Sequence, residues 1–431
     1  MKYYSLNKIS PQVSFAQAAV KGQAPDKGLY FPETIHQLPK GFIQNLKNYS
    51  KEEIGFVVMK PYIAETIDDK ALQQIINETV NFNFPLVKIN ENIFSLELFH
   101  GPTLAFKDVG ARFMSRCLSY FNRNNHHQVT VLVATSGDTG GAVANGFLGV
   151  DGVDVIILYP KNKVSKIQEL QLTTLGKNIT ALEIEGTFDD CQTIVKQAFA
   201  DVDLNKKLQL TSANSINVAR WLPQQLYYFY AYRQWNENEP PIICVPSGNF
   251  GNICAGILAH VSGLPVKHFI AACNANNVVT DYLQTQQYRP KPAVATISNA
   301  MDVGNPSNFI RILELFHHQF NSLKNKMSSI SVDDATTRQT IKNIFEKYNY
   351  TLDPHGAVAY FALENYLQNY LTAKGFILET AHPVKFPETV EEMTKQKIAF
   401  PQSVLHLLSK QKKSILMQPN FNNFKEWLMS K

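Results

Sequence analysis

The chain has 431 residues, of which 45% are apolar and 18% charged, a composition typical of a folded globular protein with more than one domain. Its net charge of +5 is small and dispersed, without the dense Lys/Arg clusters of nucleic-acid-binding proteins. The five cysteines form no CxxC pair, so we expect neither a disulfide framework nor a zinc site. The first residues lack the apolar core of a signal peptide, and no apolar run could span a membrane; we expect a cytoplasmic protein.

The first 85 residues predict a small N-terminal accessory domain. A segment punctuated by Pro and Gly, APDKGLYFPE, precedes a helix expected near residues 66–81. Thr66 or Asp68 could cap this helix. Its apolar face consists of Leu72, Ile75, Ile76 and Val80.

From residue 86 onward, apolar strands alternate with helices. LVKI and IFSLEL are predicted strands, and a helix is expected from about Ala105, with apolar residues at four-residue steps. Later strands are VTVLVA (129–134), VDVIILYP, IICVP (242–246), FIAAC and GFILET. This alternation indicates an α/β fold with parallel sheets covered on both faces. We expect two such domains, over residues 86–235 and 236–431.

Two glycine-rich turns follow predicted strands and open helices. We call residues 135–142 the TSGDTGGA turn and residues 247–252 the SGNFGN turn. Ligands of parallel sheets bind beyond the carboxyl ends of strands, and a helix start offers unpaired N–H groups to an anion. Each turn alone could equally be an ordinary strand-to-helix connection. Together they suit one ligand with two anionic groups.

Lys107 stands at a predicted helix start among apolar residues, in FHGPTLAFKDVGARF. A desolvated lysine has a lowered pKa and can act as an amine nucleophile. The alternatives are a lysine that reaches water or one that pairs with Asp108.

Six motifs occur in an order that resembles one enzyme family. They are FHGPTLAFKD, ATSGDTGGAV, SANSIN, VPSGNFGN, SNAMDVGNPSN and TAHPVKF. The chain is similar over nearly its whole length to threonine synthases of the longer bacterial and fungal type. These are pyridoxal-phosphate enzymes of fold type II, related in fold to the tryptophan synthase β chain. The resemblance implies two parallel-sheet α/β domains with a small N-terminal domain.

The resemblance also implies the roles of individual residues. Lys107 would carry pyridoxal 5'-phosphate as a Schiff base, and Thr380 would face the pyridine nitrogen. The cofactor phosphate would be bound by Gly248, Asn249, Phe250, Gly251 and Asn252. The substrate carboxylate would be bound by Thr135, Ser136, Gly137 and Thr139. Asp138 stands where many fold-type-II enzymes have asparagine, which leaves its relation to the ring hydroxyl open.

Asn214, Ser215 and Arg220 match the group that receives the substrate phosphate. Without the resemblance, the first two could be helix caps and Arg220 a surface charge. Three histidines adjoin these motifs. We expect His355 in the first turn of a helix capped by Asp353, and His100 and His382 either line the pocket or serve the structure.

The implied reaction converts O-phospho-L-homoserine and water to L-threonine and phosphate. Lys107 would remove the substrate's α-proton and later a β-proton, and protonation at the γ-carbon and addition of water at the β-carbon would follow. The alternatives are an O-phosphohomoserine phospho-lyase, a related dehydratase and a nucleotide-binding module without catalysis. We expect a small-molecule substrate, no nucleic-acid or membrane partner, no metal, and a monomer or homodimer.

Overall fold

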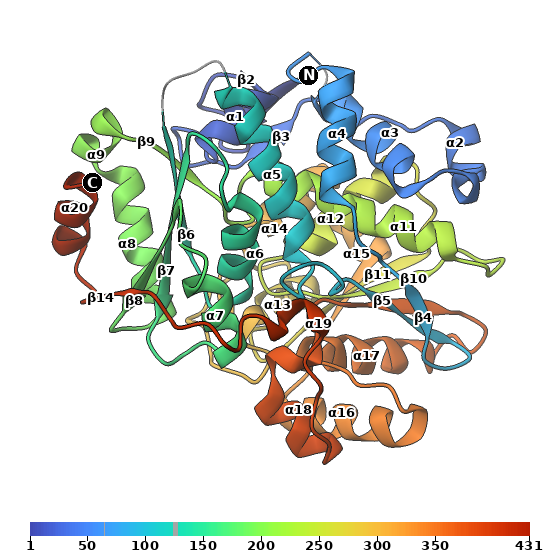
Figure 1. The fold of residues 1–431 in the computed structure, drawn as a ribbon. Coiled ribbons are helices and arrows are strands. Elements are labelled where there is room, and N and C mark those ends of the chain that lie inside the picture. The colour runs from blue at the N-terminus through green and yellow to red at the C-terminus, as the bar shows by residue number, and fades with distance from the viewer. Residues whose placement is uncertain (64, 124–127) are drawn as a thin grey trace.

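Three β-sheets organise the residues that the computed structural model describes, which are 1–63, 65–123 and 128–431 (Figure 1). Their strand orders are β2-β1-β3, β12-β11-β10-β13-β5-β4 and β14-β8-β7-β6-β9. The two larger sheets are predominantly parallel and are flanked by helices. The prediction of an α/β fold with parallel sheets and a small N-terminal unit is therefore confirmed.

The N-terminal unit combines a short antiparallel sheet with helices. Asp68 caps α4 by accepting a hydrogen bond from the Ala71 N–H, so Asp68 rather than Thr66 begins the predicted helix. The predicted apolar face of α4 is buried. The elements are β1 (Lys2–Ser5), β2 (Val13–Ser14), α1 (Phe15–Lys21), β3 (Tyr30–Pro32), α2 (Lys40–Gln44), η1 (Leu46–Asn48), α3 (Lys51–Ile63) and α4 (Asp69–Thr79).

All strands of the five-stranded sheet are parallel and covered on both faces. Along β6, Leu132 packs with α8 and α20, whereas Val131 and Val133 belong to the core that includes α5 and α6. The strands are β6 (Val129–Ala134), β7 (Val153–Pro160), β8 (Ile179–Ile184), β9 (Gln209–Ser212) and β14 (Ile415–Met417). The helices are α5 (Lys107–Asn122), α6 (Asp138–Phe147), α7 (Lys166–Thr173), α8 (Phe188–Ala200), α9 (Val202–Lys207) and α20 (Phe421–Met429).

The six-stranded sheet is parallel except at β4, which runs antiparallel to β5. Its strands are β4 (Leu86–Lys88), β5 (Ile93–Glu97), β10 (Ile242–Pro246), β11 (His268–Cys273), β12 (Met327–Ser331) and β13 (Gly375–Glu379). The flanking helices are α10 (Val218–Trp221), α11 (Leu226–Gln234), α12 (Gly251–Val261), α13 (Val278–Thr285), α14 (Phe309–Leu315), α15 (Phe320–Lys326), α16 (Asp334–Tyr348), α17 (Pro354–Leu367), α18 (Pro387–Thr394) and α19 (Gln402–Leu405). Single 3₁₀ turns are η2 (Leu222–Gln225), η3 (Asn299–Met301) and η4 (Pro383–Lys385).

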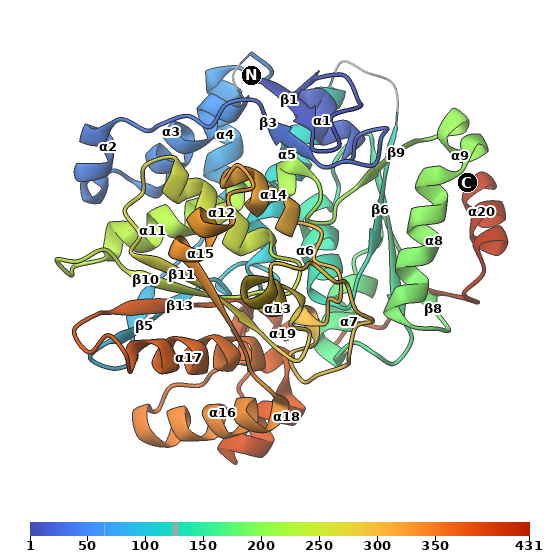
Figure 2. The same cartoon turned by 180° about the vertical axis from the view of Figure 1, so that it is seen from behind.

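The C-terminal segment runs from the six-stranded sheet back to the five-stranded one (Figure 2). Val404 and Leu407 pack against Leu104 and against Ile167 and Leu170 of α7. The chain then adds β14 to the edge of β8 and packs α20 on α8. Each large sheet thus contains strands from distant parts of the chain, and the division at residues 85 and 235 stays a prediction.

Candidate active site

Three chain segments meet around the start of α5. The Phe106 N–H donates to the Thr380 carbonyl (2.9 Å), and the His382 N–H donates to the Leu104 carbonyl (3.0 Å). A β-bridge joins Ala105 to Ala381 between these bonds. Lys107 is the first residue of α5, so it lies beside the carboxyl end of β13. Parallel sheets present their ligands at this edge.

Lys107 is largely buried, and burial lowers the pKa of its amine. Nearby Asp138 opposes that shift, whereas Lys385 and Arg220 reinforce it. The alternative of a pair with Asp108 is wrong, because the Asp108 carboxylate accepts from the Thr103 N–H (3.0 Å) and hydroxyl (2.6 Å). Among the described residues Lys107 forms no salt bridge, because Asp138 is paired with Lys385, and its amine is thus free to act as a nucleophile.

The SGNFGN turn brings its backbone close to a neighbouring segment. A Cβ on Gly248 would lie 2.6 Å from the Met301 Cα, so the close approach requires glycine. Phe250 has a left-handed backbone, with φ of 59°, immediately before α12. The Asn252 Nδ2 is buried and has no partner among the described residues, while Tyr228 donates to its Oδ1 (2.8 Å). A buried donor at a helix start is suited to an anion.

Side chains outside the SGNFGN turn hold it in place. The Ser215 hydroxyl accepts from Asn249 Nδ2 (2.6 Å) and Asn308 Nδ2 (3.1 Å). Asn308 also donates to the Asn249 carbonyl (3.1 Å). The fully buried Arg311 donates to the Ser215 carbonyl (3.2 Å) and the Ile216 carbonyl (2.6 Å). Asn308 belongs to the quoted motif SNAMDVGNPSN but received no role, and no local pattern distinguishes Arg311 from a surface arginine.

The TSGDTGGA turn is held mainly by its own first residue. The Thr135 hydroxyl accepts from the N–H groups of Gly137 and Gly140, both at 2.9 Å. Gly137 has a φ of 134°, which a side chain rarely adopts. Ser136 and Thr139 keep part of their surface accessible. Thr135 thus supports the turn, whereas these two hydroxyls can reach a ligand.

A buried ion pair stands at the start of α6. Lys385 Nζ lies 2.6 Å from Asp138 Oδ1, and Gln168 Nε2 donates to the same oxygen (3.0 Å). Burial alone would raise the pKa of Asp138, but Lys385 and then Lys107 outweigh it and lower that pKa. The sequence predictions gave Lys385 no role, although it lies in the motif TAHPVKF.

Arg220 is buried behind α5 rather than exposed, so the surface-charge alternative is wrong. It donates to the Ala213 carbonyl, its Nε has no partner among the described residues, and burial lowers its pKa to about 10. The helix-cap alternative is also wrong, because Asn217 caps α10. Asn214 Nδ2 donates to the Ala134 carbonyl (3.3 Å), which ties this segment to the TSGDTGGA turn.

Thr380 directly follows β13, and the three histidines of the neighbouring motifs lie in different segments. The Thr380 hydroxyl makes no hydrogen bond with the described residues, although its side chain is almost fully buried. His355 follows the N-cap Asp353 as predicted; it bonds to that carboxylate (2.9 Å) and accepts from the Ala300 N–H (3.3 Å). His100 pairs with Glu97 (2.7 Å), and His382 caps η4. These contacts are structural.

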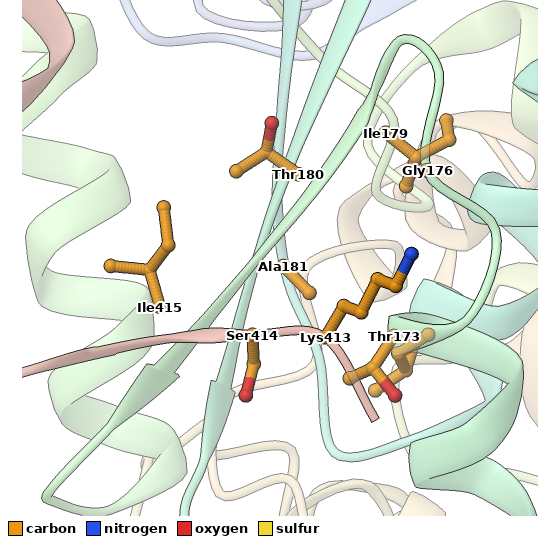
Figure 3. A pocket seen from close by; sticks show the side chains of 9 residues that line it. Thr173, Gly176, Ile179, Thr180, Ala181, Lys413, Ser414 and Ile415 are labelled. Atoms are coloured by element: carbon orange, nitrogen blue, oxygen red, sulfur yellow. The ribbon is translucent and has the colours of Figure 1, made fainter. Parts of the chain in front are cut away.

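A separate cavity of about 250 Å³ lies between β8 and the segment before β14 (Figure 3). Its polar lining comes from Thr173, Thr180, Lys413 and Ser414. The residues predicted for catalysis are not part of that lining. Within residues 1–63, 65–123 and 128–431, no cluster of three or more His, Cys, Asp or Glu side chains could hold a metal ion.

Sequence profiles of known families cover the whole site. The profile described as pyridoxal-phosphate dependent enzyme matches residues 80–378. The profiles described as threonine synthase N terminus and threonine synthase, C-terminal, match residues 2–80 and 356–427.

Known relatives match over most or all of both chains. The threonine synthase of Buchnera aphidicola from Acyrthosiphon pisum is 42% identical over 434 residues, covering 100% of both chains. That of Escherichia coli K12 is 43% identical over 411 residues, covering 94% of both.

Solved structures extend the similarity to three dimensions. Threonine synthase from Escherichia coli superposes with a TM-score of 0.92 at 40% identity, covering 100% of both chains. A threonine synthase from Brucella melitensis with bound pyridoxal phosphate reaches 0.93 at 32% identity, covering 100% of this chain and 99% of the other. A tomato threonine deaminase, at 16% identity and a TM-score of 0.55, shares the fold over 77% of this chain and 95% of its own.

Proposed function

The chain belongs to the threonine synthase family of pyridoxal-phosphate enzymes, and from that premise we propose which of its side chains perform the reaction. The enzyme is a lyase that converts O-phospho-L-homoserine and water to L-threonine and phosphate. The phospho-lyase alternative is not favoured, because the full-length relatives described above are threonine synthases.

The described residues fit pyridoxal phosphate. The buried Asn252 Nδ2 lacks a partner beside the start of α12, where a phosphate would supply acceptors. The free Thr380 hydroxyl can donate to a ring nitrogen. We propose that residues 248–252 hold the phosphate, Lys107 the aldehyde carbon and Thr380 the ring nitrogen.

When bound, pyridoxal phosphate accepts the electrons released as bonds at the substrate's α- and β-carbons break. Lys107 Nζ would take the proton from the α-carbon of the substrate and later one from the β-carbon. Burial lowers the pKa of this amine, which favours the neutral form that accepts a proton. Phosphate leaves the γ-carbon, which then gains a proton. Water adds its hydroxyl to the β-carbon, and the α-carbon regains its proton.

Two groups of side chains orient the substrate in this proposal. Ser136 and Thr139, with the N–H groups at the start of α6, bind the carboxylate, while Thr135 and Gly137 shape the turn. Arg220 binds the substrate phosphate together with Asn214 and Ser215. Ser215 also accepts a hydrogen bond from Asn249, a residue of the proposed cofactor-phosphate site. This contact supports a position for Ser215 between the cofactor phosphate and the substrate phosphate.

The observation that carries the proposal is a largely buried lysine that forms no salt bridge with the described residues and lies beside the end of β13. The neighbouring strand β10 leads into the helix start of α12, which could hold an anion. The purified protein should be yellow because of its bound cofactor. Reduction with borohydride should attach the cofactor covalently to Lys107, which labels that residue. Lys107→Ala should lose roughly a thousandfold or more in phosphate release. Peptide mapping that finds the label on another lysine would contradict the assignment, and 2-oxobutyrate as main product would contradict the reaction.

The remaining proposals concern surroundings and assembly. The buried thiols of all five cysteines support a reducing, cytoplasmic location. The small net charge supports a protein without a nucleic-acid partner. We further propose that it acts as a monomer or homodimer. No helix among the described residues is long and apolar enough to cross a membrane.

A further inference from the structure

Lys385 is a second buried lysine beside Lys107, and the proposed reaction does not use it. Its side chain has no exposed surface, whereas Asp138, its partner at 2.6 Å, keeps a small exposed fraction of 5%. Burying two charges costs free energy that only good geometry and additional hydrogen bonds recover. The surroundings of the pair provide both.

Two neighbouring segments fix the pair. Gln168, in the first turn of α7, donates to Asp138 Oδ1 (3.0 Å), and its own Oε1 accepts from the Ser165 N–H (3.0 Å). On the other side, Lys385 Nζ donates to the Thr103 carbonyl (2.9 Å). Neither charged group can turn away without breaking more than one hydrogen bond.

The same contacts connect the pair to Lys107. Thr103, which accepts from Lys385, also holds the carboxylate of Asp108, the residue after Lys107. Lys385 and Asp138 therefore lie around the loop that presents Lys107. Asp138 Oδ1 is occupied, but Oδ2 accepts no hydrogen bond from the part of the chain that the structure describes. One oxygen of the carboxylate thus stays available, and Asp138 is near enough to Lys107 to oppose the lowering of its pKa.

We propose that Asp138 is the counter-ion of the Lys107 nitrogen in the cofactor-bound enzyme, and that Lys385 is the positioning residue that keeps Asp138 ionised and oriented. The inference rests on the proposed function, because it requires the cofactor on Lys107. It also accounts for an aspartate at this place: an ionised carboxylate stabilises a protonated nitrogen, and Lys385 offsets its burial. The opposing effects of Asp138 and Lys385 on the pKa of Lys107 agree with this arrangement.

The test is a spectrophotometric pH titration of the bound cofactor in the holoenzyme, combined with thermal unfolding. Asp138→Asn removes the anion, so the pKa of the Lys107 Schiff base should fall by about 1 unit or more. Lys385→Met leaves an unpaired buried carboxylate, so the melting temperature should fall by several degrees and less cofactor should remain after gel filtration. The double variant lacks both charges. Its melting temperature should return most of the way to that of the wild type, yet the pKa of its bound cofactor should stay below the wild-type value.

A matched control is Lys374→Met, which breaks a half-buried pair with Glu237 (2.8 Å) at the start of β13. The bound cofactor of this control variant should titrate with the same pKa as in the wild type. If Lys385→Met does not fold, Asp138→Asn and the double variant still decide the question. The proposal is overturned if Asp138→Asn titrates like the wild type or if the stability losses of the two single changes add in the double variant. A wild-type protein without a titrating chromophore would instead contradict the proposed function.

Discussion

The TSGDTGGA and SGNFGN turns follow parallel strands in the same way but are stabilised differently. In the TSGDTGGA turn, the Thr135 hydroxyl occupies two backbone N–H groups, and the charge of Asp138 is paired with Lys385. The SGNFGN turn has no charged side chain, and its support comes from Ser215 and Asn308. The buried Asn252 Nδ2 in that turn is left without a partner among the described residues.

This difference indicates different tasks. A turn that uses its own hydroxyl to satisfy its amides remains intact while Ser136 and Thr139 gain and lose a ligand, as a substrate site requires. A turn with an unpaired buried donor needs an acceptor, which a bound anion supplies. The SGNFGN turn is therefore suited to a resident phosphate, and the TSGDTGGA turn to a substrate carboxylate that is exchanged.

Substitution of Arg220 tests the chain segment between the two turns, and we expect it to have a larger effect than substitutions in the turns themselves. Arg220→Ala should lower kcat/KM for O-phosphohomoserine by a factor corresponding to about 2–5 kcal/mol, because a buried phosphate loses a charged donor. The bound cofactor should remain, as measured by visible absorbance. Unchanged kcat/KM would show that another residue holds the substrate phosphate.

Two glycine substitutions, one in each turn, test the proposed difference between the turns directly. Gly248→Ala should weaken cofactor binding by about 1–3 kcal/mol, because the new Cβ would meet the Met301 backbone. Gly141→Ala is the matched control in the TSGDTGGA turn, where the nearest atom, 3.2 Å away, is the end of the Gln171 side chain. Equilibrium dialysis of the cofactor measures both. Equal losses in the two variants would contradict the division of tasks.

Thr380→Val tests a contact with the cofactor ring that lies outside both turns. Losing one hydrogen bond to the ring should weaken cofactor binding by about 1 kcal/mol and lower turnover, with the fold unchanged. Thr380→Ser, which keeps the hydroxyl, should bind the cofactor like the wild type. If Thr380→Val also does so, Thr380 is not the partner of the ring nitrogen.

The last expected effect concerns the pH dependence of stability, through the pKa of His382 near Lys385. Burial, followed by nearby His100, lowers the pKa of His382 to about 4. The unfolded chain binds a proton near pH 6.5, so between these values it carries more protons than the folded chain, and stability falls as pH falls from about 6.5 to 4. His382→Asn, which can still cap η4, should reduce this loss. Urea unfolding at several pH values measures it, and an unchanged slope would assign the loss to other groups.

The sequence predicted the elements well because their signals are local. The apolar periodicity of α4, the continuous apolar run of β6 and the Asp353–Pro354 start of α17 each depend on neighbours in the chain. The candidate site was also found from motifs, but its supporting side chains were not. Arg311 resembles a surface arginine in sequence, and only its burial on Trp221 distinguishes it.

By itself, the sequence determined an α/β chain with two glycine-rich turns after strands and one lysine at an apolar helix start, because a few consecutive residues specify each of these features. The tertiary structure decided which charges face one another. Asp138 and Lys385 are far apart in the chain, and they meet because the start of α6 and η4 converge on the loop before α5. The electrostatic balance at Lys107 depends on distance through space and on burial, and a linear pattern contains neither.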